Sequence, residues 1–160
     1  MAEGGHRATL TREQLRIWRD YIETAEALRT RLASRMLSES SLSSGDYQVL
    51  LALSEAAQRT VRSSELADRI GWERSRLSHH LGRMEKRGLI RREACAEVAH
   101  GVDVIATDAG MAAFRAGSVP HLRAVRELFI DALAPAQLTE VEGLTAALRE
   151  HLGLDPESQG

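Results

Sequence analysis

A short segment in the middle of the chain carries arginine, serine and histidine at spacings that place them on one side of a helix. Leu77, Leu81 and Met84 recur at intervals of three and four residues, so they would face a core. The polar side chains that then lie toward solvent are Arg74, Ser75, Ser78, His79 and Arg83. Arginine can pair with two acceptors of guanine at once, and serine and histidine offer shorter hydrogen bonds to bases or phosphates. This face therefore offers the chemistry needed to read a DNA groove, and a merely solvated face is the alternative interpretation.

Two further side chains near this face suit phosphate better than bases. Arg76 points more sideways from the same helix, so we expect it to hold the phosphate backbone. Ser63 begins the preceding helix, where its hydroxyl and the nearby backbone N–H groups are placed to bind a phosphate. A plain N-cap is the other interpretation of Ser63, and the two roles do not exclude each other.

No group of residues offers catalytic chemistry. The sequence contains no nucleophile motif, glycine-rich phosphate loop or metal-ligand spacing, which predicts a protein that is not an enzyme and needs no cofactor. His79 and His80 are adjacent, so on a helix they point about 100° apart and cannot chelate one metal ion together. The single cysteine, Cys95, cannot form an internal disulfide, and we expect an idle thiol rather than a redox sensor.

Two short helices and a hairpin are predicted to position the polar face. The earlier of these two helices starts at Ser63 and ends before Gly71. The later one runs from about Arg74 to Arg87, before Gly88. A tight glycine-containing turn between short helices is typical of a helix-turn-helix. The segments 89–95 and 102–106 then change to the period of strands and are predicted to form a β-hairpin.

The N-terminal third is predicted to be helical. Thr11 and Gln14 form a capping-box pattern, and the helix that follows runs to about Leu37 with apolar residues at spacings of three and four. Ser43 and Asp46 cap a second helix. A long apolar stripe of this kind needs a partner helix.

The C-terminal third repeats this pattern. Thr107 caps a fifth helix, in which Pro120 is expected to produce a kink or a break, and Pro135 fits the first turn of a sixth. Apolar stripes at both ends would be partly exposed in a monomer, which predicts a homodimer.

Charge and composition narrow the class of partner. No apolar run approaches the roughly 20 residues of a membrane-spanning helix, and residues 1–7 show no secretory signal, so we expect a soluble, cytoplasmic protein with no membrane partner. The net charge of −2 argues mildly against nucleic acid. Its distribution argues the other way, because residues 59–92 carry +6 and the rest of the chain carries −8. This split predicts one segment that faces phosphate.

Several strings, in this order, resemble the MarR family of winged helix-turn-helix regulators. Pro120 and the junction at 133–135 are similar as well, and the resemblance covers nearly the whole chain. The strings are Ser64-Glu65-Leu66-Ala67, Ser75-Arg76-Leu77-Ser78-His79-His80-Leu81, Arg83-Met84-Glu85-Lys86-Arg87-Gly88-Leu89-Ile90 and Thr107-Asp108-Ala109-Gly110. The resemblance implies a mainly α (α+β) fold, a winged helix-turn-helix with N- and C-terminal dimerisation helices. Residues 1–160 would form one domain, with 43–107 as its DNA-binding part and 11–37 and 108–153 as dimerisation helices.

The resemblance also implies a function. Members of the family are homodimers that grip successive turns of double-stranded DNA, and many release it on binding a small, often phenolic, ligand. We therefore expect a sequence-specific regulator, acting as a repressor on a pseudo-palindromic operator with half-sites about 10 base pairs apart. A winged helix used only for protein contacts and a metal-responsive regulator are the alternatives. Candidates for lining an effector cavity, each also typical of a core, are Trp18, Tyr21, Tyr47 and Met111.

The hairpin tip departs from the family's pattern. The tip usually carries an aspartate and one or two arginines, and here the stretch is Glu97-Val98-Ala99-His100-Gly101. The arginine that normally enters the minor groove is missing. His100 is the nearest substitute, but histidine is shorter and mostly neutral near pH 7, so the wing is expected to contribute little to DNA binding.

Overall fold

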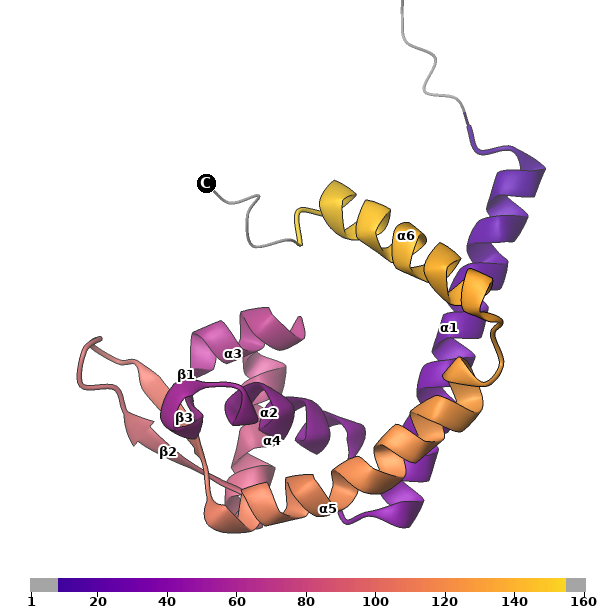
Figure 1. Ribbon diagram of the computed structural model, residues 1–160. Helices are drawn as coiled ribbons and strands as arrows, with labels where there is room; N and C mark the ends of the chain where they lie inside the picture. Colours follow the sequence, from indigo (N-terminus) through magenta and orange to yellow (C-terminus); the bar gives the residue numbers. More distant parts are fainter. Residues whose placement is uncertain (1–8, 155–160) are drawn as a thin grey trace, which may run out of the picture.

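The computed structural model describes residues 9–154, which form six α-helices and a small sheet (Figure 1). The N-terminal stretch that bears on a secretory signal lies outside these residues. No helix among them is long and apolar enough to cross a membrane. The elements, in order, are α1 (Arg12–Glu39), α2 (Ser44–Ser54), a 3-10 turn (Ala57–Arg59), β1 (Thr60–Arg62), α3 (Ser63–Ile70), α4 (Arg74–Lys86), β2 (Ile90–Ala94), β3 (Val102–Ala106), α5 (Asp108–Val125), a π-helical turn (Arg126–Ile130) and α6 (Pro135–His151).

Capping residues begin three of the helices as the sequence predicts. The Thr11 hydroxyl accepts from the Gln14 N–H at 3.1 Å, and the Gln14 side chain accepts from the Thr11 N–H at 2.9 Å. Ser43 and Asp46 form the same reciprocal pair at the start of α2. The Thr107 hydroxyl accepts from the backbone N–H three residues on, at 3.0 Å. These bonds satisfy donors that would otherwise lack a partner at each helix start.

The winged helix packs around one hydrophobic core. Its sheet is antiparallel in the order β1-β3-β2, and Val61 of β1 pairs with Val104 of β3. The predicted hairpin is confirmed as β2 and β3, whereas β1 was not predicted. Side chains from the helices and strands close the core with at most 1% exposure each, and they include Leu50, Leu53, Leu66, Leu77, Leu81, Met84, Ile90 and Val104. The mainly α fold with a winged helix-turn-helix is therefore confirmed.

The long helices lie largely outside this core, which the first part of α5 joins through Met111. α1 packs along α5, and α6 extends away from their junction toward the open side of the molecule (Figure 1). None of the described residues of α6 is buried. Large apolar side chains that remain exposed on α1, on α6 and at the C-cap of α6 are Leu15, Ile17, Trp18, Tyr21, Ile22, Leu37, Leu144, Leu148 and Leu152. A surface of this kind marks an interaction site.

The structure decides two local predictions. Of the kink or break expected at Pro120, a break does not occur, because α5 continues through Pro120 to Val125, and Figure 1 shows α5 bending along its length. A proline removes one backbone N–H, which a helix held on both sides can tolerate with a bend. α3 begins at Ser63 itself, with Arg62 at the N-cap position and no side-chain cap. The plain N-cap interpretation of Ser63 therefore fails by one residue.

Candidate nucleic-acid interface

The turn between α3 and α4 sets the direction of the second helix. Gly71 adopts φ 67°, a left-handed conformation that glycine takes without steric cost, and it ends α3. The next N–H, of Trp72, returns to the carbonyl of Ala67 at 3.0 Å. α4 then buries Leu77, Leu81 and Met84 in the core. Its other side is thereby directed outward.

The exposed side of α4 carries the side chains that the sequence singled out. All of them are exposed in the structure, so the fold brings them to one surface: Arg74, Ser75, Arg76, Ser78, His79 and Arg83. Ser63, at the start of α3, is half-buried. Nine arginines and one lysine lie between residues 59 and 92. A protruding helix with donors along its outer face has the form and charge that a major groove accepts.

Arg76 is held by an aromatic ring. Its guanidinium lies 4.0 Å from the centre of the Trp72 ring, which is a cation–π contact. This contact restricts the rotamers of Arg76, because only some of them keep the guanidinium over the ring. The side chain is thus directed sideways from α4, as its position in the sequence suggests.

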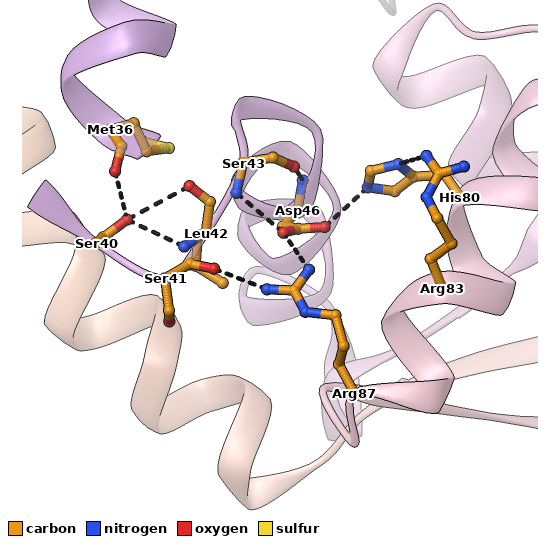
Figure 2. A network of polar contacts seen from close by, with 9 residues as sticks. All are labelled: Met36, Ser40, Ser41, Leu42, Ser43, Asp46, His80, Arg83 and Arg87. Atoms are coloured by element: carbon orange, nitrogen blue, oxygen red, sulfur yellow. Dashed lines mark hydrogen bonds and ion pairs between the residues drawn. The ribbon is translucent and has the colours of Figure 1, made fainter. Parts of the chain in front are cut away.

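A buried polar network, which sequence reasoning missed, lies behind α4 (Figure 2). Asp46 of α2 is 1% exposed, and its carboxylate accepts from Arg87 at 2.7 Å. His80 of α4 is 9% exposed, and its Nε2 lies 3.0 Å from Asp46 in a geometry that is not aligned as a full hydrogen bond. The Nδ1 atom of His80 lies 2.9 Å from Nη2 of Arg83. The network therefore reaches from the core to the exposed face.

The network shifts two pKa values. Burial raises the pKa of the Asp46 carboxyl, but hydrogen bonds from Arg87 and Ser43 outweigh it and hold this pKa below its ordinary value. Burial lowers the pKa of His80, Asp46 raises it and Arg83 lowers it again, and the result is below the ordinary histidine value. An ionised Asp46 facing a neutral His80 is the state that these shifts favour.

A signal for this network does exist in the sequence. His80 stands in the spacing of Leu77, Leu81 and Met84, so it occupies a core-facing position. A buried imidazole requires a polar partner. Nothing local identifies that partner as Asp46, because the two residues are far apart in the chain.

The wing, which is the hairpin of β2 and β3, lies beside α4 and is joined to it by Arg92. The guanidinium of Arg92 donates to Glu85 at 2.8 Å. The exposed Arg91 of the wing pairs with Glu93 at 2.8 Å. The tip is closed by the Cys95 N–H, which donates to the Gly101 carbonyl at 2.8 Å. His100 is exposed there with φ 62°. The arginines of the wing thus lie on its strand and not at its tip.

An open cavity of about 890 Å³ lies between α1, α2 and α4. Of the four predicted effector residues, only Tyr47 lines it. Trp18 and Tyr21 are exposed on α1, and Met111 is packed in the core, so the structure does not bring the four together. The ring of His121 lies 4.6 Å from that of Tyr47, and burial lowers the His121 pKa. Other lining residues include Arg29, Trp72, His79, His80 and Arg83.

Within residues 9–154, no three His, Cys, Asp or Glu side chains come close enough together to hold a metal ion. Cys95 is half-buried, with its sulfur 3.7 Å from the Arg62 guanidinium.

Comparison with known proteins identifies the family. A family model described as the MarR family matches residues 40–99. A search of curated protein sequences finds no match. Among solved structures, AbsC, a MarR family transcriptional regulator from Streptomyces coelicolor, is 34% identical with a TM-score of 0.82, covering 92% of this chain and 99% of that one.

Two more structures are similar. Sco3205, a MarR family transcriptional regulator from the same organism in complex with DNA, is 35% identical with a TM-score of 0.84, covering 96% of this chain and 95% of that one. The organohalide-sensing regulator RdhR-CbdbA1625, with 2,4-dichlorophenol bound, is 21% identical with a TM-score of 0.75, covering 94% and 89%. At 21% identity, the likeness to RdhR-CbdbA1625 shows the fold alone. The match to two regulators at about a third identity over nearly their whole length shows that this chain belongs to the MarR family of transcriptional regulators and is not an enzyme.

Proposed function

We propose that the protein is a homodimeric, cytoplasmic repressor that binds a pseudo-palindromic operator in double-stranded DNA and is released by a small aromatic effector. The observation that carries this proposal is the exposed face of α4, where six polar side chains gather opposite a fully buried apolar side. The similarity to Sco3205, which was solved in complex with DNA, supports the same kind of partner here.

The polar residues divide into two roles in this proposal. Arg74, Ser75, Ser78, His79 and Arg83 read base edges in the major groove, because they lie on the outermost side of α4. Arg76 and Ser63 hold phosphate, and His100 is the wing's contact. All 160 residues act as one domain, with 43–107 binding DNA and 11–37 and 108–153 forming the dimer.

The dimer is supported by what one chain leaves uncovered. α6 buries nothing, and its exposed leucines would be unfavourable in water. The two helical ends of a second copy are the surface that matches them, because a twofold axis pairs like with like. Removal of residues 134–160 should therefore give aggregated or unfolded material, and a well-folded monomer that still bound operator would contradict the dimer.

The effector is proposed from the open cavity behind α4. The cavity has aromatic walls from Tyr47 and Trp72 and cationic groups from Arg29 and Arg83. Aromatic side chains with a few placed donors suit a phenol or a related aromatic anion. Arg83 belongs both to the cavity and to the face that reads DNA, so occupancy of the cavity would oppose DNA binding.

The experiment is a selection of bound duplexes from genomic fragments, beginning with the region upstream of the chain's own gene. The proposal predicts recovery of a symmetric motif with half-sites about 10 base pairs apart. A protein-contact scaffold would bind no duplex at any salt concentration. A metal-responsive regulator would lose DNA binding on chelation, and unchanged binding in EDTA is the result expected here.

A further inference from the structure

Two buried polar side chains, Asp46 and His80, join α2 to α4, the helix that is proposed to read DNA and is called the recognition helix below. The Oδ2 atom of Asp46 accepts from Arg87 at 2.7 Å and from the Ser43 N–H at 2.9 Å, while Oδ1 lies 3.0 Å from His80 Nε2. Arg87 also donates to the carbonyl of Ser41 at 2.7 Å. Arg87 is the C-cap of α4 and lies about two turns after His80. One carboxylate therefore contacts the recognition helix at two points along its length, as Figure 2 shows.

The contact to Arg83 fixes the protonation state of His80. A guanidinium can only donate, so Nδ1 of His80, which lies 2.9 Å from Nη2 of Arg83, must accept. The proton of the neutral ring is then on Nε2, which faces the Asp46 carboxylate. The negative charge of Asp46, with Oδ1 3.0 Å from Nε2, favours the same tautomer electrostatically, and Nδ1 is then left to accept from Arg83.

The approach of α2 to α4 is unusually close at this point. A Cβ atom on Gly45 would lie 2.8 Å from the Trp72 ring and 2.9 Å from Cε1 of His80. Trp72 also meets His80 edge to face, with ring centres 5.2 Å apart. His80 therefore has close neighbours in Gly45, Trp72 and Asp46, which restrict the movement of its ring.

We propose that Asp46 is a positioning residue for DNA recognition: it orients His80, and His80 holds the Arg83 guanidinium in the direction from which it meets a base. The proposal rests on the proposed reading of DNA by α4. A purely structural role for Asp46 would need only the Arg87 ion pair. The link onward to Arg83 leads from the buried pair to the exposed face, and it is this link that would determine sequence preference.

The first test is a double-mutant cycle read as sequence preference. The probes are the tightest duplex selected from a random library and a shuffled duplex of the same composition. Asp46→Asn should lower the ratio of the two affinities about ten-fold, and Arg83→Ala should lower it at least as much. The double variant should show no further loss, because Asp46 acts through Arg83. An unchanged ratio in Asp46→Asn, or additive losses in the double variant, would overturn the proposal.

A second pair of variants decides the question if Asp46→Asn does not fold. Asparagine at position 80 presents an acceptor close to where Nδ1 lies, and leucine presents none. His80→Asn should keep the ratio within about three-fold of wild type, and His80→Leu should lose about ten-fold. Equal ratios for the two variants would overturn the proposal, since they would mean that the side chain at position 80 only fills space.

A spectroscopic measurement tests the same relay without DNA. Long-range proton–nitrogen spectra of the imidazole in the full-length protein should show His80 as the neutral Nε2–H tautomer near pH 7. A neutral Nδ1–H tautomer, or a charged ring, would overturn the proposal. The outcomes are separable, because a wild-type protein that binds no duplex would refute the proposed function. Intact operator binding with an unchanged ratio in Arg83→Ala would refute only this inference.

Discussion

Arg92 of β2 is joined to α4 through a three-point contact with Glu85. The backbone N–H of Arg92 donates to Oε1 of Glu85 at 2.9 Å, and its Nε and Nη2 donate to Oε2 at 3.1 and 2.8 Å. The side-chain hydrogen bond from Arg92 lowers the pKa of Glu85 below its ordinary value. These hydrogen bonds join the base of the wing to α4.

Removing this contact should loosen the wing. Glu85→Ala is expected to lower the free energy of unfolding by about 1 kcal/mol, because charge-assisted hydrogen bonds to a backbone N–H and a guanidinium are lost together. Urea unfolding followed by circular dichroism measures the change. Glu93→Ala is the matched control, since its pair with Arg91 is more exposed and should change stability by less than about 0.5 kcal/mol. Equal losses in the two variants would contradict this assignment.

Arg83→Ala should weaken binding to the best operator by about 1–3 kcal/mol and relax the preference at one position in each half-site. The reason is the loss of a pair to a base edge, whose value depends on the base. Competition assays with single-base variants of the operator measure it, with the exposed Arg115→Ala on α5 as the control. A uniform loss on every sequence would mean that Arg83 is a phosphate anchor.

A cationic wing tip should bind DNA more tightly. His100→Arg is expected to raise affinity, mostly without regard to sequence, and to steepen the salt dependence by up to about one unit per subunit, because each phosphate contact adds about 0.9 to the slope. The substitution replaces one non-glycine residue by another at a left-handed backbone position, where φ is 62°. Fluorescence anisotropy over a salt series gives the slope. No gain in His100→Arg, with His100→Ala equal to wild type, would mean that the wing does not touch DNA.

Stability should fall in mild acid because two histidines resist protonation in the folded state. Burial lowers the pKa values of both His80 and His121, so the unfolded chain binds more protons as the pH drops. Their contribution is fully present above about pH 6.5 and is lost as the pH falls below it. Urea unfolding at pH 7.5 and 5.5 should show the loss, and His121→Gln should reduce it. A stability independent of pH in this window would contradict the account.

Asp46 extends this dependence further into the acid. Its folded pKa is held below the ordinary value, so its contribution is present above the unfolded pKa and is lost as pH falls through the folded one. On acidification from neutral pH to below about pH 4, Asp46→Asn should therefore lose less of its free energy of unfolding than the wild type loses.

The features that could be predicted from the sequence are those set by local rules. Caps such as Thr11 with Gln14 depend on residues three apart, and the two faces of α4 follow from the spacing of Leu77, Leu81 and Met84. The exposed polar residues of α4 could be predicted from that spacing alone.

The features that were missed depend on distant contacts. β1 has three residues, too few to show alternation, and it exists because β3 offers an edge. Asp46 was recognised only as a cap, while its carboxylate also meets His80 and Arg87 from another helix. Met111 was assigned to a cavity because an apolar side chain looks the same in sequence whether it lines a core or a pocket.

Binding of the wild-type chain to its selected duplex over a salt series tests whether this regulator reads DNA as a dimer. Two chains per duplex and a log affinity that falls linearly with log salt are expected, because several phosphates are neutralised. The shuffled duplex should bind on the order of 1,000-fold more weakly at the same salt. Binding that is equal on both duplexes, or independent of salt, would contradict it.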